Sequence, residues 1–382
     1  MYKIDDKART WAEIDLSALK FNYEYAKSIS GRTVICVLKA DAYGHGAVEC
    51  GRYLQDHCDA HMFAVATIAE AAELRDNGIR VPIMVLGYTS PEYAEMLSRL
   101  DIEQTVVDEA HAIDINRAAE QLGLIVKVHI ALDTGMSRIG LYAQRDHGAA
   151  IDAAERICKL RNLEVVGMFS HLAVADDLEQ EEFTLYQYRN FAIIYNGLAE
   201  RGIRIRNCHV SNSAAVLNCP LQFDSVRFGI SLYGMYPDSK PRMDGPLKPV
   251  MTLKSRVTQI RMLPSGSTVS YGRTFTARRN TNTAVVAAGY ADGYSRKLSN
   301  HAFITIKGRK YPQIGRICMD VCMADVTDGM DADEGGVRAG DEAILIGNGG
   351  MSFEEAAEVV GTINYELTCL VTERAKRVYV NG

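Results

Sequence analysis

The stretch TVICVLKADAYGHG (33–46) starts as a run of apolar, mostly β-branched residues and ends with a lysine followed by small residues. Seven similar apolar runs follow before residue 235: MFAVAT (62–67), VPIMVLG (81–87), EQTVVD (103–108), LIVKVHIALDTG (124–135), VVGMFSHL (165–172), CHVSN (208–212) and SVRFGISLYG (225–234). Near-continuous apolar runs are typical of strands that are covered on both faces, as in a parallel sheet. The pattern therefore predicts eight buried strands.

The segments between these runs are mostly helical in pattern. Helical spacing of apolar residues is present at 46–57, 109–121, 145–160 and 177–201. Thr67 and Glu70 form a capping box that opens another helix, whereas the last link contains Pro220 and favours a helix only weakly. Strands alternating with helices predict an α/β fold with an N-terminal (β/α)₈ TIM-type barrel. A doubly wound open sheet is the alternative, but its usual dinucleotide fingerprint is missing.

A change of pattern follows the barrel. Four of the nine prolines fall within YPDSKPRMDGPLKP (236–249), and short β-type runs with few helices come after them. One later helix is expected from the capping box of Ser352 and Glu355. We therefore expect a barrel domain at 1–244 and a mostly β domain at 245–382. The first ten or so residues are expected to pair with the second domain.

Composition excludes several classes of function. The 382 residues carry 42 basic and 48 acidic side chains, a net charge of −6, without the concentrated basic face of a nucleic-acid binder. No apolar stretch approaches a membrane span, and the polar N-terminus shows no signal peptide. The nine scattered cysteines favour reduced thiols and a cytoplasmic location. Cys318 and Cys322 have no histidine to complete a zinc set, so no metal site is predicted.

The end of the first strand carries the first chemical signal. Lys39 is costly to bury without a task, and a partly desolvated lysine amine is a usable nucleophile; an ordinary lysine at the rim is the other interpretation. SNS (211–213) and RFGIS (227–231) lie where barrels commonly bind phosphate. A lysine, a phosphate cradle and an arginine at one barrel mouth suggest pyridoxal 5'-phosphate.

These residues belong to a set of motifs that resembles the alanine racemase family. The matching stretches, in order, are WAEIDLSAL (11–19), VLKADAYGHG (37–46), DTGMSRIG (133–140), SNSAA (211–215), VRFGISLYG (226–234), VSYGRTFTA (269–277), GYADGYSR (289–296), GRICMD (315–320) and GTINYE (361–366). The resemblance implies interconversion of L- and D-alanine, which supplies D-alanine for peptidoglycan. It also implies a head-to-tail homodimer, because the two bases come from different domains.

The resemblance assigns roles to particular residues. Lys39 would hold the cofactor as an internal aldimine and act as one base, and Tyr271 of a second subunit would be the base on the opposite face. Further cofactor contacts are implied for Tyr43, Arg138, His171, Asn212, Ser213, Arg227, Gly229, Ile230 and Tyr365. His171 would activate Tyr271, and Arg227 would face the pyridine nitrogen. Arg138, Met319 and Tyr271 would receive the substrate, with Tyr290 and Asp320 lining the approach and Cys318 packing beside it.

One position departs from the family pattern. The family often has a carbamylated lysine two residues before DTGM, and Ala131 stands there in this chain. Arg138 would then be held by a chloride or another side chain, because Lys127 lies about 13 Å further along the strand.

Three other functions are compatible with the barrel signals. The first is a broader or serine-preferring racemase, which Tyr365 disfavours by filling the pocket. The others are an amino-acid decarboxylase of similar architecture and a cofactor-binding regulatory protein. The motifs at 37–46 and 269–272 argue against the decarboxylase, and the second domain with Tyr271 argues against the regulatory protein, since such proteins are typically lone barrels.

Overall fold

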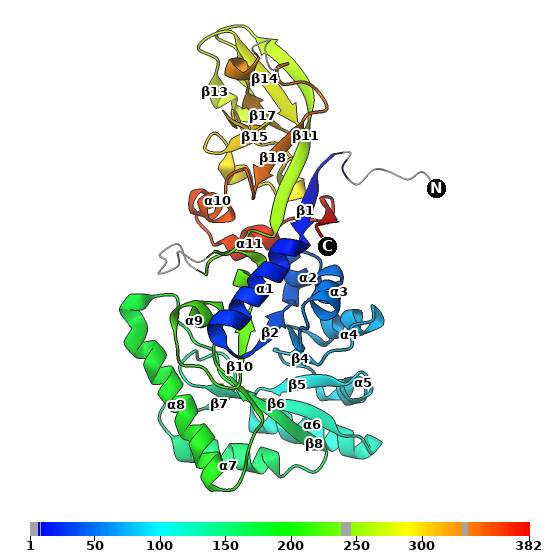
Figure 1. Ribbon diagram of the computed structural model, residues 1–382, viewed down its shortest axis with the longest axis vertical. Helices are drawn as coiled ribbons and strands as arrows, with labels where there is room; N and C mark the ends of the chain where they lie inside the picture. The colour runs from blue at the N-terminus through cyan, green and yellow to red at the C-terminus, as the bar shows by residue number, and fades with distance from the viewer. Residues whose placement is uncertain (1–6, 8, 238–245, 331–334) are drawn as a thin grey trace.

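The computed structural model describes residues 7, 9–237, 246–330 and 335–382, which form a barrel with a β-rich domain at one end (Figure 1). The barrel strands are β2 (Thr33–Val37), β3 (Met62–Val65), β4 (Ile83–Val85), β5 (Ile102–Val106), β6 (Val126–Asp133), β8 (Leu163–Phe169), β9 (Asn207–His209) and β10 (Ser225–Phe228). Each paired neighbour in the order β10-β2-β3-β4-β5-β6-β8-β9 is parallel. All eight predicted strands are confirmed.

The seam between β9 and β10 decides between a barrel and an open sheet. Asp224 N–H donates to Cys208 O and Arg227 N–H to Ser211 O, both at 3.0 Å, so the two edge strands meet. The sheet is therefore a nearly closed barrel, and the open-sheet alternative is wrong. Closure brings the carboxyl ends of all its strands to one mouth.

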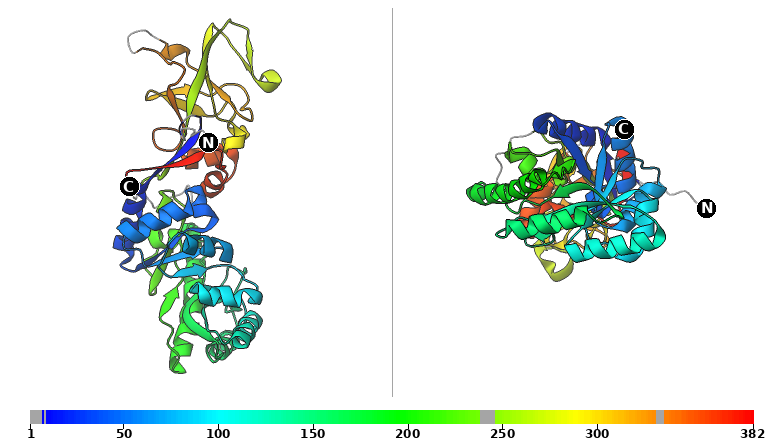
Figure 2. Two further views of the ribbon diagram at one scale, coloured as in Figure 1. Left: turned by 90° about the vertical axis from the view of Figure 1, so that its right-hand side faces the viewer. Right: turned by 90° about the horizontal axis from the view of Figure 1, so that it is seen from below.

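Helices surround the strands, as the view from below shows (Figure 2). The predicted ones are α3 (Ala47–His57), α4 (Ile68–Asp76), α6 (Glu109–Leu122), α7 (His147–Cys158) and α8 (Glu181–Glu200), with the Thr67–Glu70 capping box in place. The pattern did not predict α1 (Leu16–Ser30) or α5 (Ala94–Arg99), and α9 (Ser213–Asn218) occupies the weakly helical last link. Within the described ranges, no helix combines the length and the apolar character needed to cross a membrane.

The β-rich domain is built around one long strand, β11 (Met251–Leu263). It joins β14 (Thr281–Val286), β15 (Phe303–Ile306), β16 (Arg309–Pro312), β17 (Cys322–Asp325), β18 (Glu342–Ile346), β1 (Trp11–Asp15) and β19 (Lys376–Val380) in one sheet. The pairings of β11 with β1, β14 and β18 are antiparallel. The Ser352–Glu355 capping box opens α10 (Phe353–Val360), as predicted, and α11 (Asn364–Cys369) follows it.

The start of the described chain belongs to the sheet of the β-rich domain. β1 lies between β11 and β19, and the Thr10 hydroxyl donates to Ala287 O at 2.6 Å. The expectation for the first ten residues concerns mainly residues 1–6 and 8, which lie outside the described residues, as does the predicted boundary at 244/245.

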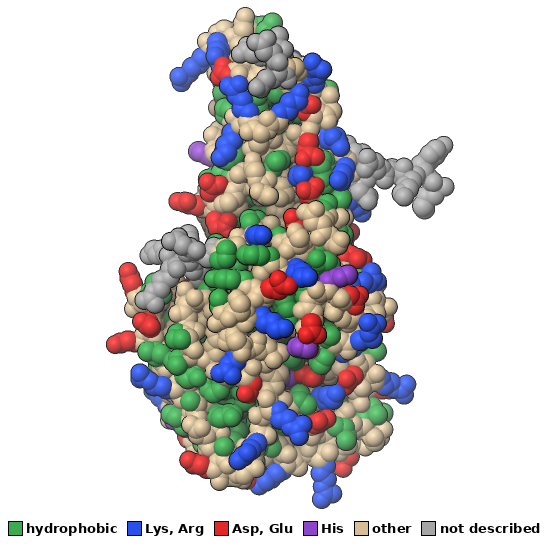
Figure 3. All heavy atoms as spheres, viewed as in Figure 1, with side chains coloured by type: hydrophobic (Ala, Val, Ile, Leu, Met, Phe, Trp, Pro, Cys, Tyr) green, Lys and Arg blue, Asp and Glu red, His purple; other side chains and the backbone are tan. Residues whose placement is uncertain are grey.

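One apolar core joins the two parts. The same cluster of buried side chains includes Ile35 and Phe228 of the barrel and Leu253 and Ile304 of the β-rich domain. On the face shown in Figure 3, basic and acidic side chains are interspersed over both parts. The continuous core holds the barrel mouth and the β-rich domain in a fixed relation.

Candidate active site

A cavity of about 410 Å³ lies at the mouth of the barrel. It is lined by all ten residues for which the sequence predicts a cofactor contact: Lys39, Tyr43, Arg138, His171, Asn212, Ser213, Arg227, Gly229, Ile230 and Tyr365. Most follow the carboxyl ends of barrel strands, whereas Tyr365 comes from α11. The barrel and α11 together therefore bring into one cavity residues that are more than 300 positions apart in the sequence.

Lys39 begins a turn of unusual backbone, α2 (Lys39–Gly44). Residues 40–43 all have φ between 53° and 54°, although none is glycine. A left-handed conformation costs a non-glycine residue about 1–2 kcal/mol, so surrounding contacts must hold it. Glu70 Oε1 accepts from Ala40 N–H at 2.7 Å, and Asp41 Oδ1 accepts from Ala47 N–H at 2.8 Å. The turn directs the chain back from the mouth immediately after Lys39.

The surroundings of Lys39 favour its neutral amine. Burial lowers the pKa of Lys39, and the positive charges of Arg138 and Arg227 act in the same direction, whereas Glu70 opposes them. The lower pKa increases the fraction of unprotonated amine, which is the form that attacks a carbonyl carbon.

Opposite Lys39, the loops after β9 and β10 form a cradle for an anion. Ser213 Oγ accepts from Gly229 N–H at 2.9 Å, and a Cβ on Gly229 would lie 2.7 Å from the Tyr43 hydroxyl. Only glycine leaves that space open. Ser211 and Ser231, each next in sequence to a residue that lines the cavity, have buried hydroxyls without a hydrogen-bond partner among the described residues. Hydroxyls and backbone N–H groups at this place in a barrel fit a phosphate group.

Arg227 lies at the cavity wall with its guanidinium held on several sides. It donates to His209 Nδ1 at 2.5 Å, Ser170 O at 2.7 Å and Val210 O at 2.9 Å. Burial lowers its pKa to about 9, and Arg138 acts in the same direction, so Arg227 remains a cation at neutral pH. Its Nε donates to no described residue, which leaves a fixed donor beside the cavity.

His171 lies next to this guanidinium, with Nδ1 3.4 Å from Arg227 Nη2. Burial lowers the pKa of His171 well below its usual value, and Arg227, Arg138 and Lys39 add to the effect. His171 is therefore a neutral imidazole that accepts at Nδ1 and can donate from Nε2.

Arg138 contrasts with Arg227. Within the described part of the chain, no hydrogen bond or ion pair restrains its guanidinium, and the side chain is exposed. Ala131, in the place of the family's modified lysine, is buried. Lys127 forms an ion pair with Asp101 at 2.7 Å, so it does not replace that lysine.

The other predicted site residues lie outside this cavity. Tyr271, Tyr290, Cys318, Met319 and Asp320 belong to three loops of the β-rich domain, residues 270–272, 289–292 and 316–320, here called the loop cluster. The loops are joined by Ser270 Oγ donating to Arg316 O at 2.5 Å and by Tyr290 N–H donating to Cys318 O at 3.1 Å. Tyr271 is 70% exposed and Met319 is 51% exposed.

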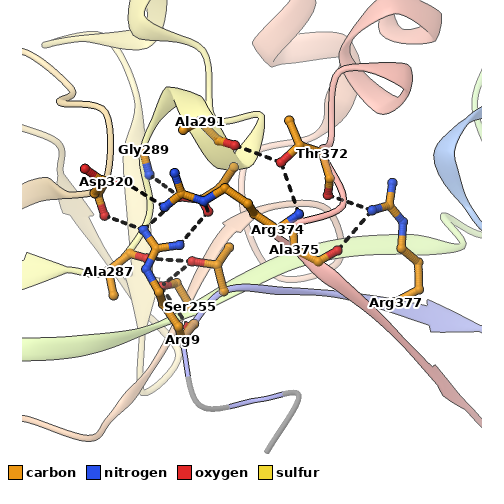
Figure 4. Close-up of polar contacts among 12 residues, drawn as sticks. Arg9, Ser255, Ala287, Gly289, Ala291, Asp320, Thr372, Arg374, Ala375 and Arg377 are labelled. Atoms are coloured by element: carbon orange, nitrogen blue, oxygen red, sulfur yellow. Dashed lines mark hydrogen bonds and ion pairs between the residues drawn. The ribbon is translucent and has the colours of Figure 1, made fainter. Parts of the chain in front are cut away.

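Two arginines fix the loop cluster from behind (Figure 4). The buried carboxylate of Asp292 pairs with Arg9 at 2.5 Å and with Arg374 at 3.3 Å. Arg9 also donates to Asp320 O, and Arg374 to Asp320 Oδ1, both at 2.7 Å. The backbone beside Met319 is thereby tied to residues near both ends of the described chain.

No local sequence pattern predicts these supporting residues. Asp292 lies within the motif GYADGYSR, but its partners are more than 80 positions away in the sequence, and no local pattern indicates them. Glu70 was found only as a capping residue, although its carboxylate also accepts from Ala40 N–H. One polar contact of Arg227 does have a signal in the sequence. His209 is a polar residue within the strand segment CHVSN, and such a residue needs a hydrogen-bond partner when it is buried.

The fold and the cavity define a two-domain barrel enzyme with a lysine amine facing an anion cradle. Residues 14–237 match the family model "Alanine racemase, N-terminal domain", and residues 250–379 match "Alanine racemase, C-terminal domain". The chain belongs to the alanine racemase family. It is an isomerase that acts as a racemase of alanine, and a serine-preferring activity is not favoured.

Individual relatives are similar to this chain over nearly its whole length. Alanine racemase from Clostridium novyi (strain NT) is 43% identical over 380 residues, covering 97% of this chain and 95% of the relative. The structure of alanine racemase from Clostridium difficile 630 in complex with cycloserine has a TM-score of 0.88 and 38% identity, covering 99% and 96% of the two chains. That of alanine racemase from Bacillus anthracis with bound L-Ala-P has a TM-score of 0.87 and 30% identity, covering 100% and 97%.

Proposed function

We propose that the cavity binds pyridoxal 5'-phosphate and that alanine is racemised there by two bases on opposite faces, Lys39 and Tyr271. The observation that carries this proposal is the placement of the Lys39 amine across one cavity from the Ser213–Gly229 cradle and the Arg227 guanidinium. The donors suit a phosphate at one end, a ring nitrogen at the other and a carbonyl carbon beside Lys39. When bound, the cofactor withdraws electrons from Cα and so acidifies the α-proton of the substrate.

Racemisation needs a proton to leave one face of Cα and another to arrive on the opposite face. Lys39 serves one face, because its amine is directed into the cavity and its lowered pKa favours proton exchange near neutral pH. Tyr271 serves the other face. The neutral His171 assists Tyr271, since its Nδ1 is engaged by Arg227 and its Nε2 is left to the cavity side.

Arg227 limits side reactions in this proposal. A guanidinium that remains protonated at neutral pH offers the pyridine nitrogen a hydrogen bond and disfavours its protonation. The bound cofactor would then be a weaker electron sink, which would disfavour transamination. Arg138 receives the substrate carboxylate together with the backbone of Met319.

A second copy of the chain supplies Tyr271 and Met319. Within one chain these residues are exposed and do not line the cavity. The arrangement supports a head-to-tail homodimer in which each loop cluster closes the barrel mouth of the partner.

The same proposal includes a cellular role. D-alanine from this reaction would enter peptidoglycan synthesis. The nine cysteines form no disulfide, which supports the cytoplasm as the location of the enzyme.

Mixed dimers test both the two bases and the dimer. Co-expressed Lys39→Ala and Tyr271→Phe chains would form mixed dimers with one intact site and one doubly altered site. With random pairing, half of the dimers are mixed, so activity should return to about one quarter of the wild-type value. Dimers of either single variant serve as controls. Activity no higher than in those controls would show that Lys39 and Tyr271 act within one chain.

A further inference from the structure

A line of four polar side chains runs from the cavity wall through the buried interior of the barrel. Arg227 Nη1 lies 2.5 Å from His209 Nδ1, and His209 Nε2 lies 3.3 Å from His129 Nδ1. His129 Nε2 then lies 2.6 Å from Glu103 Oε2. The line crosses strands β10, β9, β6 and β5. The reaction as proposed above uses only its first member.

The direction of the hydrogen bonds follows from the arginine. A guanidinium can only donate, so His209 must accept at Nδ1 and carry its proton on Nε2. That N–H donates to His129 Nδ1, which places the proton of His129 on Nε2 as well. The last N–H donates to the Glu103 carboxylate. All four groups are satisfied when both histidines are neutral, with a cation at one end and an anion at the other.

The backbone makes room for this line. His129 and His209 are fully buried, and the side chain of Glu103 is 12% exposed near the amino-terminal end of β5. The β6–β8 register shifts between Val128 and His129. A Cβ on Gly167, in β8, would lie 2.2 Å from His129 Nδ1, so only glycine fits beside that ring. A bulge and a glycine at the same point accommodate an imidazole in an otherwise apolar layer.

Other charged groups act on both ends of the line. At the cavity, Arg138 and His171 face Arg227, and burial together with Arg227 keeps the pKa of His209 well below its usual value. At the opposite end, burial lowers the pKa of Arg75, and the charges of Asp101 and Glu103 oppose this shift. The hydrogen bond to Asp101 raises the pKa of Lys127, and the charge of Glu103 acts in the same direction. Lys127 is paired with Asp101, so the single carboxylate that reaches His129 is that of Glu103 among the described residues.

We propose that His209, His129 and Glu103 are positioning residues for the cofactor ring, which fix the orientation of Arg227 and balance its charge from the far end of the barrel. This inference rests on the proposed placement of the pyridine ring beside Arg227. The Glu103 carboxylate fixes the His129 tautomer, and His129 in turn fixes His209. The arginine is then held as a donor in one orientation. The arrangement follows the general rule that the partner of one imidazole nitrogen sets the behaviour of the other.

The test compares holoenzyme variants at the two ends of the line. Glu103→Gln keeps an acceptor for His129 but removes the charge, whereas Glu103→Leu removes both. Asp101→Asn is the matched control, because it removes an exposed carboxylate at the same end of the barrel that, among the described residues, is paired with Lys127 alone. Arg227→Lys reports on the ring directly. The readouts are the ¹⁵N resonances of labelled histidines, the pH midpoint of the visible band of the bound cofactor, and kcat/KM.

The wild-type spectrum should show His129 and His209 as neutral imidazoles with the proton on Nε2. Glu103→Gln should retain these tautomers, move the pH midpoint of the band to lower pH and lower kcat/KM roughly tenfold, because an anion that favours proton uptake is lost. Glu103→Leu should also disturb the tautomers. Asp101→Asn should match the wild type.

Three results would overturn the inference. One is a wild-type Nδ1–H tautomer or a charged imidazole at His129 or His209. Another is a Glu103→Gln variant with the midpoint and kcat/KM of Asp101→Asn while Arg227→Lys shifts the band, since the ring then lies at Arg227 but is insensitive to the line. The third is an unshifted band in Arg227→Lys, which removes the proposed placement of the ring and the inference with it.

Discussion

The barrel mouth and the loop cluster differ in how much of their environment one chain provides. At the mouth, Arg227 and Ser213 are buried, His171 is half-buried, and all three are hydrogen-bonded before any partner is present. In the loop cluster, the backbone is tied firmly by Asp292, yet Tyr271 and Met319 point their side chains into solvent. One half of the site is preorganised in its side chains and the other half only in its backbone, which is what a surface awaiting a second copy requires.

The largest loss of activity is expected from substituting Lys39 at the barrel mouth. Lys39→Ala should lower kcat by a factor on the order of 10⁴ or more, because it removes both the covalent attachment and one base. The visible absorption of the bound cofactor should disappear with the activity. Retention of that absorption would show that another lysine holds the cofactor. Tyr142→Phe, which alters an exposed tyrosine near the barrel, is a control for handling and folding.

In the loop cluster, loss of the Tyr271 hydroxyl should lower kcat by nearly as much. Tyr271→Phe should lower kcat about 10³-fold while the visible absorption persists, because a positioned base contributes roughly 10²–10⁴ and the cofactor is held by the other half of the site. Spectra and racemisation rates measured on one preparation check this. Undiminished turnover of both enantiomers would contradict the two-base assignment. Tyr142→Phe, at an exposed tyrosine to which no role in the site is assigned, is the matched control for loss of one phenol hydroxyl.

The support behind the loop cluster should matter for stability. Asp292→Asn should lower the free energy of unfolding by about 3 kcal/mol, since it leaves two arginines facing a buried neutral group. Urea denaturation measures this, and the exposed pair of Asp328 with Arg279 supplies the control Asp328→Asn, for which little change is expected. An equal change in the free energy of unfolding for the two variants would show that the buried pairs of Asp292 stabilise the fold no more than an exposed ion pair does.

In the barrel, by contrast, buried histidines should make the folded state less stable at low pH. Burial lowers the pKa of His45 to about 3 and those of His171 and His209 well below their usual values. Below about pH 6.5 the unfolded chain takes up these protons and the folded chain does not, so stability falls as pH falls. Each histidine contributes roughly 1.4 kcal/mol per pH unit.

His45→Gln offers the measurement of one of these contributions. Between pH 6 and 5 the slope of unfolding free energy against pH should decrease by about 1.4 kcal/mol per unit relative to the wild type. A wild-type stability that is flat over this range would show that the histidines are accessible to protons in the folded state.

The sequence predicted the parts of the fold that depend on local pattern. The eight barrel strands are continuous apolar runs, and both capping boxes involve residues three positions apart, so a short window contains the whole signal. The left-handed turn at 40–43 has no such signal, because it contains no glycine and depends on Glu70 from another element. α1 was missed although Leu16, Leu19, Tyr23 and Ala26 form a buried stripe along it.

The residues of the candidate site also fall into two groups, those that local sequence pattern indicates and those that it does not. Lys39 and the SNS and RFGIS segments lie at strand ends, where the barrel rule places function, and they do line one cavity. The assignment of Tyr271 and Met319 came from family resemblance, because nothing local distinguishes them from surface residues. The contact between His129 and Glu103 was not predicted, because it depends on the β5–β6 pairing and on the bulge beside Gly167.

The pairing of β1 with β19 has a consequence for synthesis on the ribosome. Trp11 pairs with Lys376, so a strand made at the outset finds its neighbour only about 365 residues later. The barrel can collapse as it emerges, but this sheet remains incomplete until nearly the whole polypeptide has been translated. Arg9 and Arg374, which reach Asp292 from the two sides of that pairing, therefore hold the loop cluster in place only at the final stage of folding.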